Sequence, residues 1–238
     1  METSVYYEHQ AVARGHVSPA DVLANVTLNS GMYDRILLPW LPKDKGAFVY
    51  EVACGAGICL KWLSTRGYTN SAGSDLSDVQ IALAQANGMN VSLQDALGDL
   101  KGRPNGSIDC LIALDFYEHL PKEVLLDFLK DAHRVLAPGG KLILRGPNGD
   151  SPLLGRALYN DITHYWALTS VAFNALLQMF GFRAVEFRDD TLARFDRGRW
   201  LRVPLAWIAQ KVLHWLLRLA TRENIRYFSS SFFICATK

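Results

Sequence analysis

The sequence lacks most of the features that would assign it to a class at first sight. Its net charge is only +2, so composition gives no reason to expect a nucleic-acid binder. The amino-terminal residues METSVYYEHQ hold no basic region followed by an apolar run, so we expect no signal peptide. The four cysteines lie in apolar surroundings without paired metal-ligand spacing, which predicts reduced core thiols in a reducing, cytoplasmic compartment.

A length of 238 residues, half of them hydrophobic, predicts one globular domain with an insertion. Its organising stretch is AFVYEVACGAG, residues 47–57, where four apolar residues lead into Glu51 and a turn of small residues opens a helical pattern. This strand, turn and helix would let the backbone approach a nucleotide closely. The third glycine of the dinucleotide fingerprint is replaced by Leu60, which makes a nicotinamide oxidoreductase the least favoured reading.

Downstream, short apolar runs alternate with helical patterns, as expected for a doubly wound parallel sheet. The predicted strands are residues 47–50, 71–74, 90–94, 108–114, 141–144, 182–187 and 231–237. The predicted helices are residues 19–28, 32–40, 58–66, 78–87, 121–136 and 169–181, with an extra helix at 201–220 before the last strand.

Five segments in order resemble motifs of the class I S-adenosylmethionine-dependent methyltransferases. Residues 47–57 resemble motif I, an acidic residue followed by G-x-G-x-G, but Ala53 replaces the first glycine and is expected to lack access to positive φ. The resemblance implies a Rossmann-like sheet of order 3-2-1-4-5-7-6, with strand 7 antiparallel and the site outside the carboxyl ends of the strands. The other segments are GSDLS (73–77), QDA (94–96), LDFYEHLP (114–121) and RVLAPGGKLIL (134–144).

The resemblance also implies S-adenosylmethionine as cofactor and S-adenosylhomocysteine as product. Asp75 would accept from both ribose hydroxyls and Asp95 from the exocyclic amine of adenine. Both carboxylates could instead cap helices, but we favour ligand contact because they end successive parallel strands. The predicted cofactor-binding residues are Glu51, Ala53, Gly55, Gly57, Asp75, Leu76, Asp95, Ala96 and Leu114.

Methyl transfer to a hydroxyl needs a group that aligns the acceptor and removes its proton, and histidine suits this near neutral pH. The candidate catalytic residues are His164, in the loop after the fifth strand, and His119, after the fourth. The D-x-T-H segment that ends at His164 resembles loops of methyltransferases that act on bacterial polysaccharides and secondary metabolites, and Asp161 would orient the histidine. The plainer interpretation is that His119 caps a helix and His164 anchors the loop.

A metal-assisted transfer is the competing mechanism, with ligands from Asp115, Glu118, His119 and His164. Their arrangement in the sequence does not match the metal-dependent catechol-type pattern, so we predict no metal. The predicted acceptor is a small molecule, a glycan precursor or a phosphorylated compound. The residues expected to bind it are Tyr117, Glu118, Asn148, Arg156, Asp161 and Tyr165.

We expect residues 1–46 to form a helical arm or lid and residues 47–238 the methyltransferase domain. Within that domain, residues 145–168 would form a substrate loop and residues 190–228 a helical insertion. The helix at 201–220 combines a basic stripe with a broad apolar face, which fits a lid, a homodimer contact or a peripheral contact with an anionic membrane. Nearby arginines could equally hold a phosphorylated or acidic acceptor: Arg194, Arg197, Arg199 and Arg202.

Two alternatives to O-methylation stay open. A C-methyltransferase acting on a quinone or lipid ring would use the same cofactor site without a base at His164. A non-catalytic S-adenosylmethionine-binding module would bind the cofactor without turnover on any acceptor. The acceptor itself cannot be read from variable loops.

Overall fold

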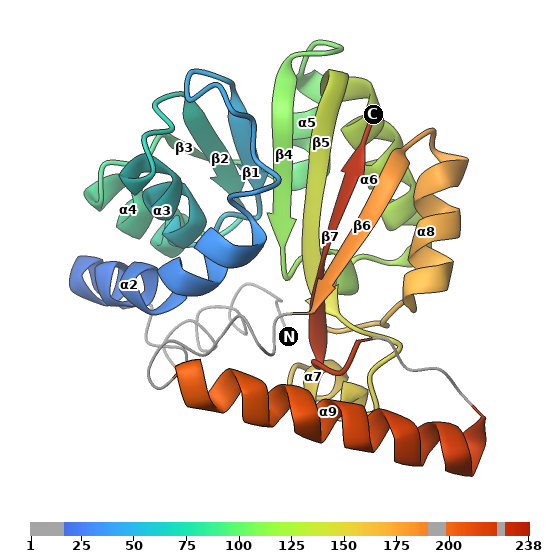
Figure 1. Cartoon of the computed structure of the whole chain (residues 1–238). Coiled ribbons are helices and arrows are strands. Elements are labelled where there is room, and N and C mark those ends of the chain that lie inside the picture. Colours follow the sequence, from blue (N-terminus) through green and yellow to red (C-terminus); the bar gives the residue numbers. More distant parts are fainter. Residues whose placement is uncertain (1–16, 190–198, 223–226) are drawn as a thin grey trace.

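A computed structural model describes residues 17–189, 199–222 and 227–238. A seven-stranded sheet of order β3-β2-β1-β4-β5-β7-β6 forms its centre (Figure 1). Strand β7 runs antiparallel to both β5 and β6, and the other pairs are parallel. The predicted fold class is therefore confirmed. The strands are β1 Val49–Val52, β2 Ser71–Asp75, β3 Val91–Leu93, β4 Ile108–Leu114, β5 Leu136–Pro147, β6 Arg183–Asp189 and β7 Ser231–Thr237.

Helices cover both faces of the sheet, which explains why β1 and β4 are mostly apolar and mostly buried. One apolar core lies between the sheet and α2, α3 and α4, and a second lies between the opposite face and α5, α6 and α8. The helices on the first face are α2 Pro19–Ile36, α3 Ile58–Thr65 and α4 Asp78–Ala86. Those on the second are α5 Ala96–Gly102, α6 Lys122–Val135 and α8 Ser170–Met179.

Side-chain caps begin several helices where the sequence predicted them. Ser18 accepts from the Asp21 amide at the start of α2, and Ser77 accepts from the Gln80 amide at the start of α4. Thr169 does the same for α8. These local signals fix where the helices start, and so how the preceding loops enter them.

The prediction of two helices at 19–28 and 32–40 is wrong, because α2 continues without a break through Gly31 to Ile36. A glycine inside a helix costs about 1 kcal/mol, and contacts with α3 offset that cost. The Asp34 carboxylate accepts from Trp62 and makes two hydrogen bonds with Arg66, at 2.6 and 2.7 Å. This part of the predicted arm packs against the domain.

Two further elements lie at the carboxyl edge of the sheet: α7 Leu154–Leu158, in the loop after β5, and α9 Arg199–Thr221, which crosses below that edge in Figure 1. A short 3-10 turn, Tyr117–His119, follows β4. The edge that carries the methyltransferase-like motifs is thus also the edge on which the irregular segments gather.

Candidate active site

The first part of the site is the turn after β1, which is tied to the end of β2. Asp75 accepts hydrogen bonds from the amides of Gly55, at 2.8 Å, and Ser77, at 2.9 Å. Burial raises the pKa of Asp75, and the amides of Ser77, Gly55 and Leu76 oppose that rise. The structure therefore brings Asp75 and the small-residue turn together, as the motifs require.

Ala53 corrects one expectation about this turn. Its φ is 51°, close to that of Gly55, and Gly57 follows at 74°. An L-residue pays about 1–2 kcal/mol in this region, so the missing glycine does not change the path of the backbone but leaves it strained. Such strain persists where the surrounding structure imposes it, and it gathers at functional sites.

Glu51 lies beside the turn at the end of β1 and is 3% exposed. Its Oε2 has no hydrogen-bond partner among the described residues. Burial and then the neighbouring Asp75 raise the pKa of Glu51 well above its usual range, against hydrogen bonds with Leu60 and Cys59. A buried carboxyl with an unused oxygen suits a ligand that brings a cationic or hydrogen-donating group.

The remaining cofactor predictions lie on the same edge. Asp95 caps α5 through the Gly98 amide at 2.8 Å, but it remains exposed and open to a ligand. Leu76 is exposed, Ala96 is buried and Leu114 is partly buried at the end of β4. The contacts proposed for these side chains remain predictions.

The second part of the site is a cluster around His164. Its Nδ1 lies 3.0 Å from the Ala157 carbonyl and 3.2 Å from the Leu158 carbonyl. Carbonyl oxygens only accept, so Nδ1 carries the proton and Nε2 of the neutral ring is the basic nitrogen. That Nε2 lies 3.9 Å from both Glu118 Oε1 and Asp161 Oδ2, and the His164 side chain is 7% exposed.

His119 is held by a relay from the same aspartate. The Thr163 hydroxyl donates to Asp161 Oδ1 at 2.6 Å, so it accepts from His119 Nδ1 at 2.8 Å. The rings of His119 and His164 lie 4.7 Å apart, edge to face. Asp161 therefore approaches both imidazoles, His119 through Thr163 and His164 from the Nε2 side. The carbonyl contacts at Nδ1 anchor His164 in the loop and leave its Nε2 as the basic nitrogen.

Glu118 completes this cluster. It is 2% exposed, and its Oε2 has no partner among the described residues. Burial and then the charge of Asp115 raise its pKa well above the usual range. One ligand atom from each of Glu118, His119 and His164 lies within 4.8 Å of the other two, an arrangement that sequence reasoning considered but did not favour.

Sequence reasoning missed two contributors, Thr163 and Arg145. Thr163 stands inside the D-x-T-H segment, which was a usable signal. Arg145 pairs with Asp115 across the ends of β5 and β4, and Asp115 has a φ of 52°. Nothing in the local sequence marks this pair, because its partners are 30 residues apart.

The predicted acceptor-binding residues divide into three groups. Tyr117 and Asn148 are buried and bonded within the domain: the Tyr117 hydroxyl donates to Pro147, and Asn148 donates to Tyr227 and Ser229. Arg156 and Tyr165 are exposed. Glu118 and Asp161 alone of the six belong to the histidine cluster. Their roles toward an acceptor remain predictions.

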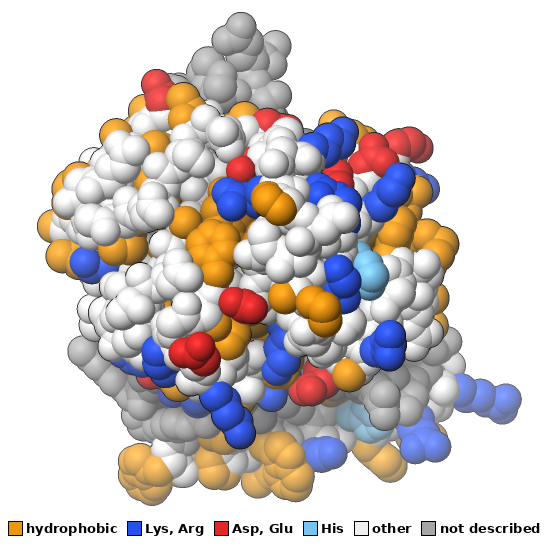
Figure 2. All heavy atoms as spheres, turned by 90° about the horizontal axis from the view of Figure 1, so that it is seen from above, with side chains coloured by type: hydrophobic (Ala, Val, Ile, Leu, Met, Phe, Trp, Pro, Cys, Tyr) orange, Lys and Arg blue, Asp and Glu red, His pale blue; other side chains and the backbone are white. Residues whose placement is uncertain are grey.

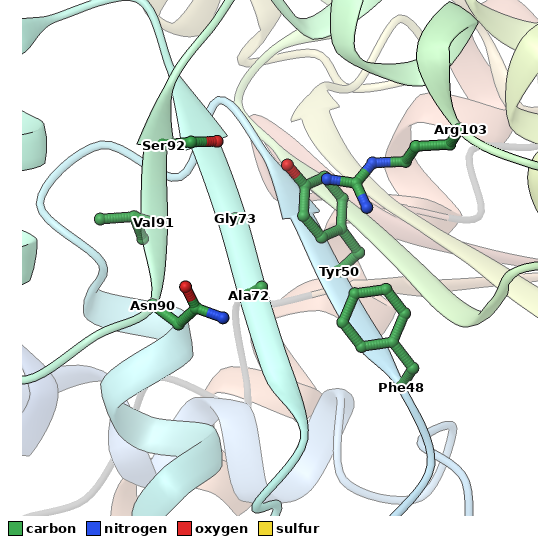
Figure 3. Close-up of a pocket in the computed structure, with 8 residues that line it drawn as sticks. All are labelled: Phe48, Tyr50, Ala72, Gly73, Asn90, Val91, Ser92 and Arg103. Carbon is green, nitrogen blue, oxygen red and sulfur yellow. The ribbon is translucent and has the colours of Figure 1, made fainter.

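A separate hollow lies on the sheet face that carries α5 (Figure 3). There the Arg103 guanidinium stacks on the Tyr50 ring at 3.6 Å, with Phe48 alongside. Asn90, Val91 and Ser92 border its other side. Neither the strand-end carboxylates nor the two histidines line it, so it is distinct from the site described above.

Comparison with known proteins gives the family. A family model described as "Methyltransferase domain" matches residues 29–186. The Mus musculus protein named "Probable tRNA methyltransferase 9B" is 31% identical over 118 residues, which are 49% of this chain and 25% of that protein. The chain thus spans only a quarter of that relative's length.

Solved structures agree on the fold. An S-adenosylmethionine-dependent methyltransferase from Archaeoglobus fulgidus has a TM-score of 0.69 at 22% identity, covering 90% of this chain and 94% of its own. Phosphoethanolamine N-methyltransferase 2 of Haemonchus contortus, in complex with S-adenosyl-L-methionine, has a TM-score of 0.63 at 16% identity, covering 96% of this chain and 59% of its own. By its matched domain, its motifs and its sheet order, the chain belongs to the class I S-adenosylmethionine-dependent methyltransferase family.

Proposed function

We propose that the chain methylates a hydroxyl group of a small molecule or glycan precursor, with S-adenosylmethionine as donor and His164 as general base. The observation that carries the proposal is the fixed tautomer of His164. Its Nδ1 is committed to two backbone carbonyls, so Nε2 is the nitrogen that can accept a proton. The buried Asp161 carboxyl group, 3.9 Å from that nitrogen, stands where it would stabilise the imidazolium that forms.

The cofactor supplies the methyl group on a sulfonium. The chain's own residues have the remaining tasks. Asp75 and the turn at Gly55 hold the nucleoside end, and Glu51 offers its unused oxygen to a cationic group. His164 takes the hydroxyl proton of the acceptor at Nε2 while the loop after β5 aligns that hydroxyl with the methyl group. Both the alignment of the acceptor hydroxyl and the removal of its proton lower the activation barrier.

The test begins with calorimetric titration of S-adenosylmethionine and S-adenosylhomocysteine into the full chain. S-adenosylhomocysteine release is then measured with free sugars, nucleotide sugars, sugar phosphates and phenols. With the acceptor found, we expect His164→Ala to lower kcat about 10²–10⁴-fold. His133→Ala, on α6 away from the cluster, is the matched control.

Three outcomes would overturn the proposal in different ways. Full turnover of His164→Ala would point to C-methylation, which needs no base there. A loss of kcat of that size in His119→Ala but not in His164→Ala would move the base to His119. Cofactor binding without release of product on any acceptor would favour the binding module.

Metal-assisted transfer is a second candidate mechanism, favoured by the clustering of Glu118, His119 and His164. Two imidazoles and a carboxylate suit zinc and other divalent transition metals, and such an ion would acidify a bound hydroxyl. This mechanism predicts a metal in the purified protein by mass spectrometry and loss of turnover on chelation. It also predicts that Glu118→Gln reduces the metal content. Turnover that survives chelation would exclude it.

A further inference from the structure

Helix α9 meets the rest of the domain along one narrow stripe. Its partly buried side chains recur at intervals of three and four residues, and no residue in the described part of the helix is fully buried. Two of the side chains in the stripe, Gln210 and His214, are polar. The helix therefore does not turn its most apolar side toward the domain, as a lid or core helix would. The stripe consists of Val203, Ala206, Gln210, His214 and Leu217.

The side of α9 opposite this stripe is apolar along its whole length. Six large apolar side chains recur there with helical spacing, and each is between 50% and 69% exposed. The row runs from Leu201 to Leu219, so it extends over about 27 Å at 1.5 Å per residue. A continuous exposed row of this length marks an interaction surface. The row is Leu201, Leu205, Ile208, Val212, Trp215 and Leu219.

The charges on α9 have a single sign. The helix contains no acidic residue, and its exposed Lys211 and Arg218 share one flank of the apolar row with Arg222, which ends the helix at a φ of 64°. Lys211 Nζ lies 5.5 Å from the centre of the Trp207 ring on the same flank. By contrast, the opposite edge of the molecule carries charges of both signs, scattered among apolar side chains (Figure 2).

We infer that α9 is a membrane-surface helix, which lies flat on an anionic lipid bilayer with its apolar row among the acyl chains and its basic flank at the headgroups. A row of Leu, Ile and Trp bordered by Lys and Arg is the pattern of an interfacial helix, and long basic side chains reach from such a row to lipid phosphates. A second copy fits less well, because a paired α9 would bring two basic flanks together with no acidic partner on either helix. The inference is independent of the proposed reaction.

The domain-facing side of α9 lies next to the loop that carries the histidine cluster. His214 of α9 lies against Phe228, with ring centres 6.4 Å apart, and the Phe228 carbonyl accepts from Ser151 just before α7. The loop that begins there exposes Leu153, Tyr159, Ile162 and Tyr165, each more than 60%. α9 therefore lies between this loop and a bilayer that contacts its apolar row. No helix in the described part of the chain is long and apolar enough to cross a membrane.

The test is sedimentation of the full chain with vesicles of phosphatidylcholine alone and of phosphatidylcholine with added phosphatidylglycerol. We expect binding to the anionic vesicles, weakened by salt, with a blue shift of tryptophan fluorescence. Ile208→Glu with Trp215→Glu should abolish the binding. Lys211→Glu with Arg218→Glu should weaken it by more than about 25-fold, since each basic residue near the surface contributes about fivefold.

Matched controls place the same kinds of change at exposed positions of other helices: Val171→Glu on α8 and Lys130→Glu on α6. Unchanged S-adenosylmethionine affinity by calorimetry would show that each variant is folded. Equal binding by the α9 variants and the controls would overturn the inference, as would the absence of binding to either vesicle. A stable dimer in sedimentation velocity, which Ile208→Glu with Trp215→Glu dissociates, would assign the row to a second copy instead.

Discussion

The two halves of the site are built in different ways. At the ends of β1 and β2, the site is formed mainly by the backbone. Ala53, Gly55 and Gly57 all have positive φ, and Asp75 accepts hydrogen bonds from two backbone amides. At the ends of β4 and β5, the site is formed mainly by side chains. Asp161, Thr163 and His119 form a chain of hydrogen bonds that spans 44 residues of sequence.

This difference has a functional consequence. Few backbone conformations form such a turn, and few residue types can adopt them. A short motif is therefore enough to hold a cofactor that a whole family shares. Side-chain contacts between loops can be rearranged without changing the sheet, so we expect the acceptor to be selected there. The two halves should therefore respond separately to substitution, and the experiments below test that separation.

The largest effect should come from Asp75→Ala. The change removes the acceptor for Gly55 and Ser77, and hydrogen bonds to a charged group are worth about 1.5–3 kcal/mol each. It also removes the proposed ribose contact. We expect the affinity for S-adenosylmethionine to fall at least about 100-fold, measured by calorimetry on a protein whose circular dichroism shows it folded.

Asp78→Ala is the control for this prediction, since Asp78 is an exposed carboxylate in the first turn of α4. It should bind the cofactor as the parent does. Parent-like affinity in Asp75→Ala would mean that the β2 end does not hold the nucleoside, and the division into two halves would fail.

A smaller and more selective effect should come from a pair of glycines. A Cβ at Gly149 would lie 2.6 Å from the Leu168 carbonyl carbon, and one at Gly73 would lie 2.7 Å from the Glu51 carbonyl oxygen. Both clashes are with backbone, which cannot rotate away, and overpacking of this kind costs about 1–3 kcal/mol. We expect Gly149→Ala to lower turnover about tenfold or more while the affinity for the cofactor changes little. Gly73→Ala should instead lower the affinity for the cofactor.

Gly155→Ala is the neutral member of this set, because its Cβ would meet only the Tyr159 ring at 3.9 Å. Calorimetry and steady-state kinetics on all three variants give the comparison. Parallel losses of affinity and turnover in Gly149→Ala and Gly73→Ala would show that the two halves act as one unit.

Sequence alone predicted the order of the sheet and the starts of several helices. The sheet order, the caps at Ser18, Ser77 and Thr169, and the strand β7 are confirmed, because each depends on a local pattern or a family motif. The helix α5 was not predicted, since its seven residues carry little periodicity. The continuity of α2 was missed because it depends on Arg66 and Trp62, residues far along the chain.

The acceptor half was predicted only as a set of residue types. The sequence pointed to His119, His164 and Asp161, but not to which nitrogen of each ring would carry the proton. Those assignments depend on the Ala157 carbonyl and the Thr163 hydroxyl, and neither contact follows from a motif. Contacts between segments that meet only in the folded chain set the chemistry here.

The smallest effect should come from relieving the strain in the turn itself. Ala53 has a φ of 51° and Ala184, in β6, a φ of 47°, and each would lose an unfavourable conformation of about 1–2 kcal/mol on replacement by glycine. Part of that gain is offset because glycine has more freedom in the unfolded chain. We expect Ala53→Gly and Ala184→Gly each to raise Tm by about 2–4 °C, the shift that 1 kcal/mol gives in a domain of this size.

The two variants should differ little in their affinity for S-adenosylmethionine, measured by calorimetry. Ala184→Gly lies outside the site, so its affinity for S-adenosylmethionine should equal that of the parent. Ala53→Gly should keep that affinity within about threefold, or about 0.7 kcal/mol, because the turn already follows the path that a glycine would take. A lower Tm for Ala53→Gly beside a higher one for Ala184→Gly would contradict the strain argument. It would mean that the Ala53 methyl group makes packing contacts worth more than its backbone conformation costs.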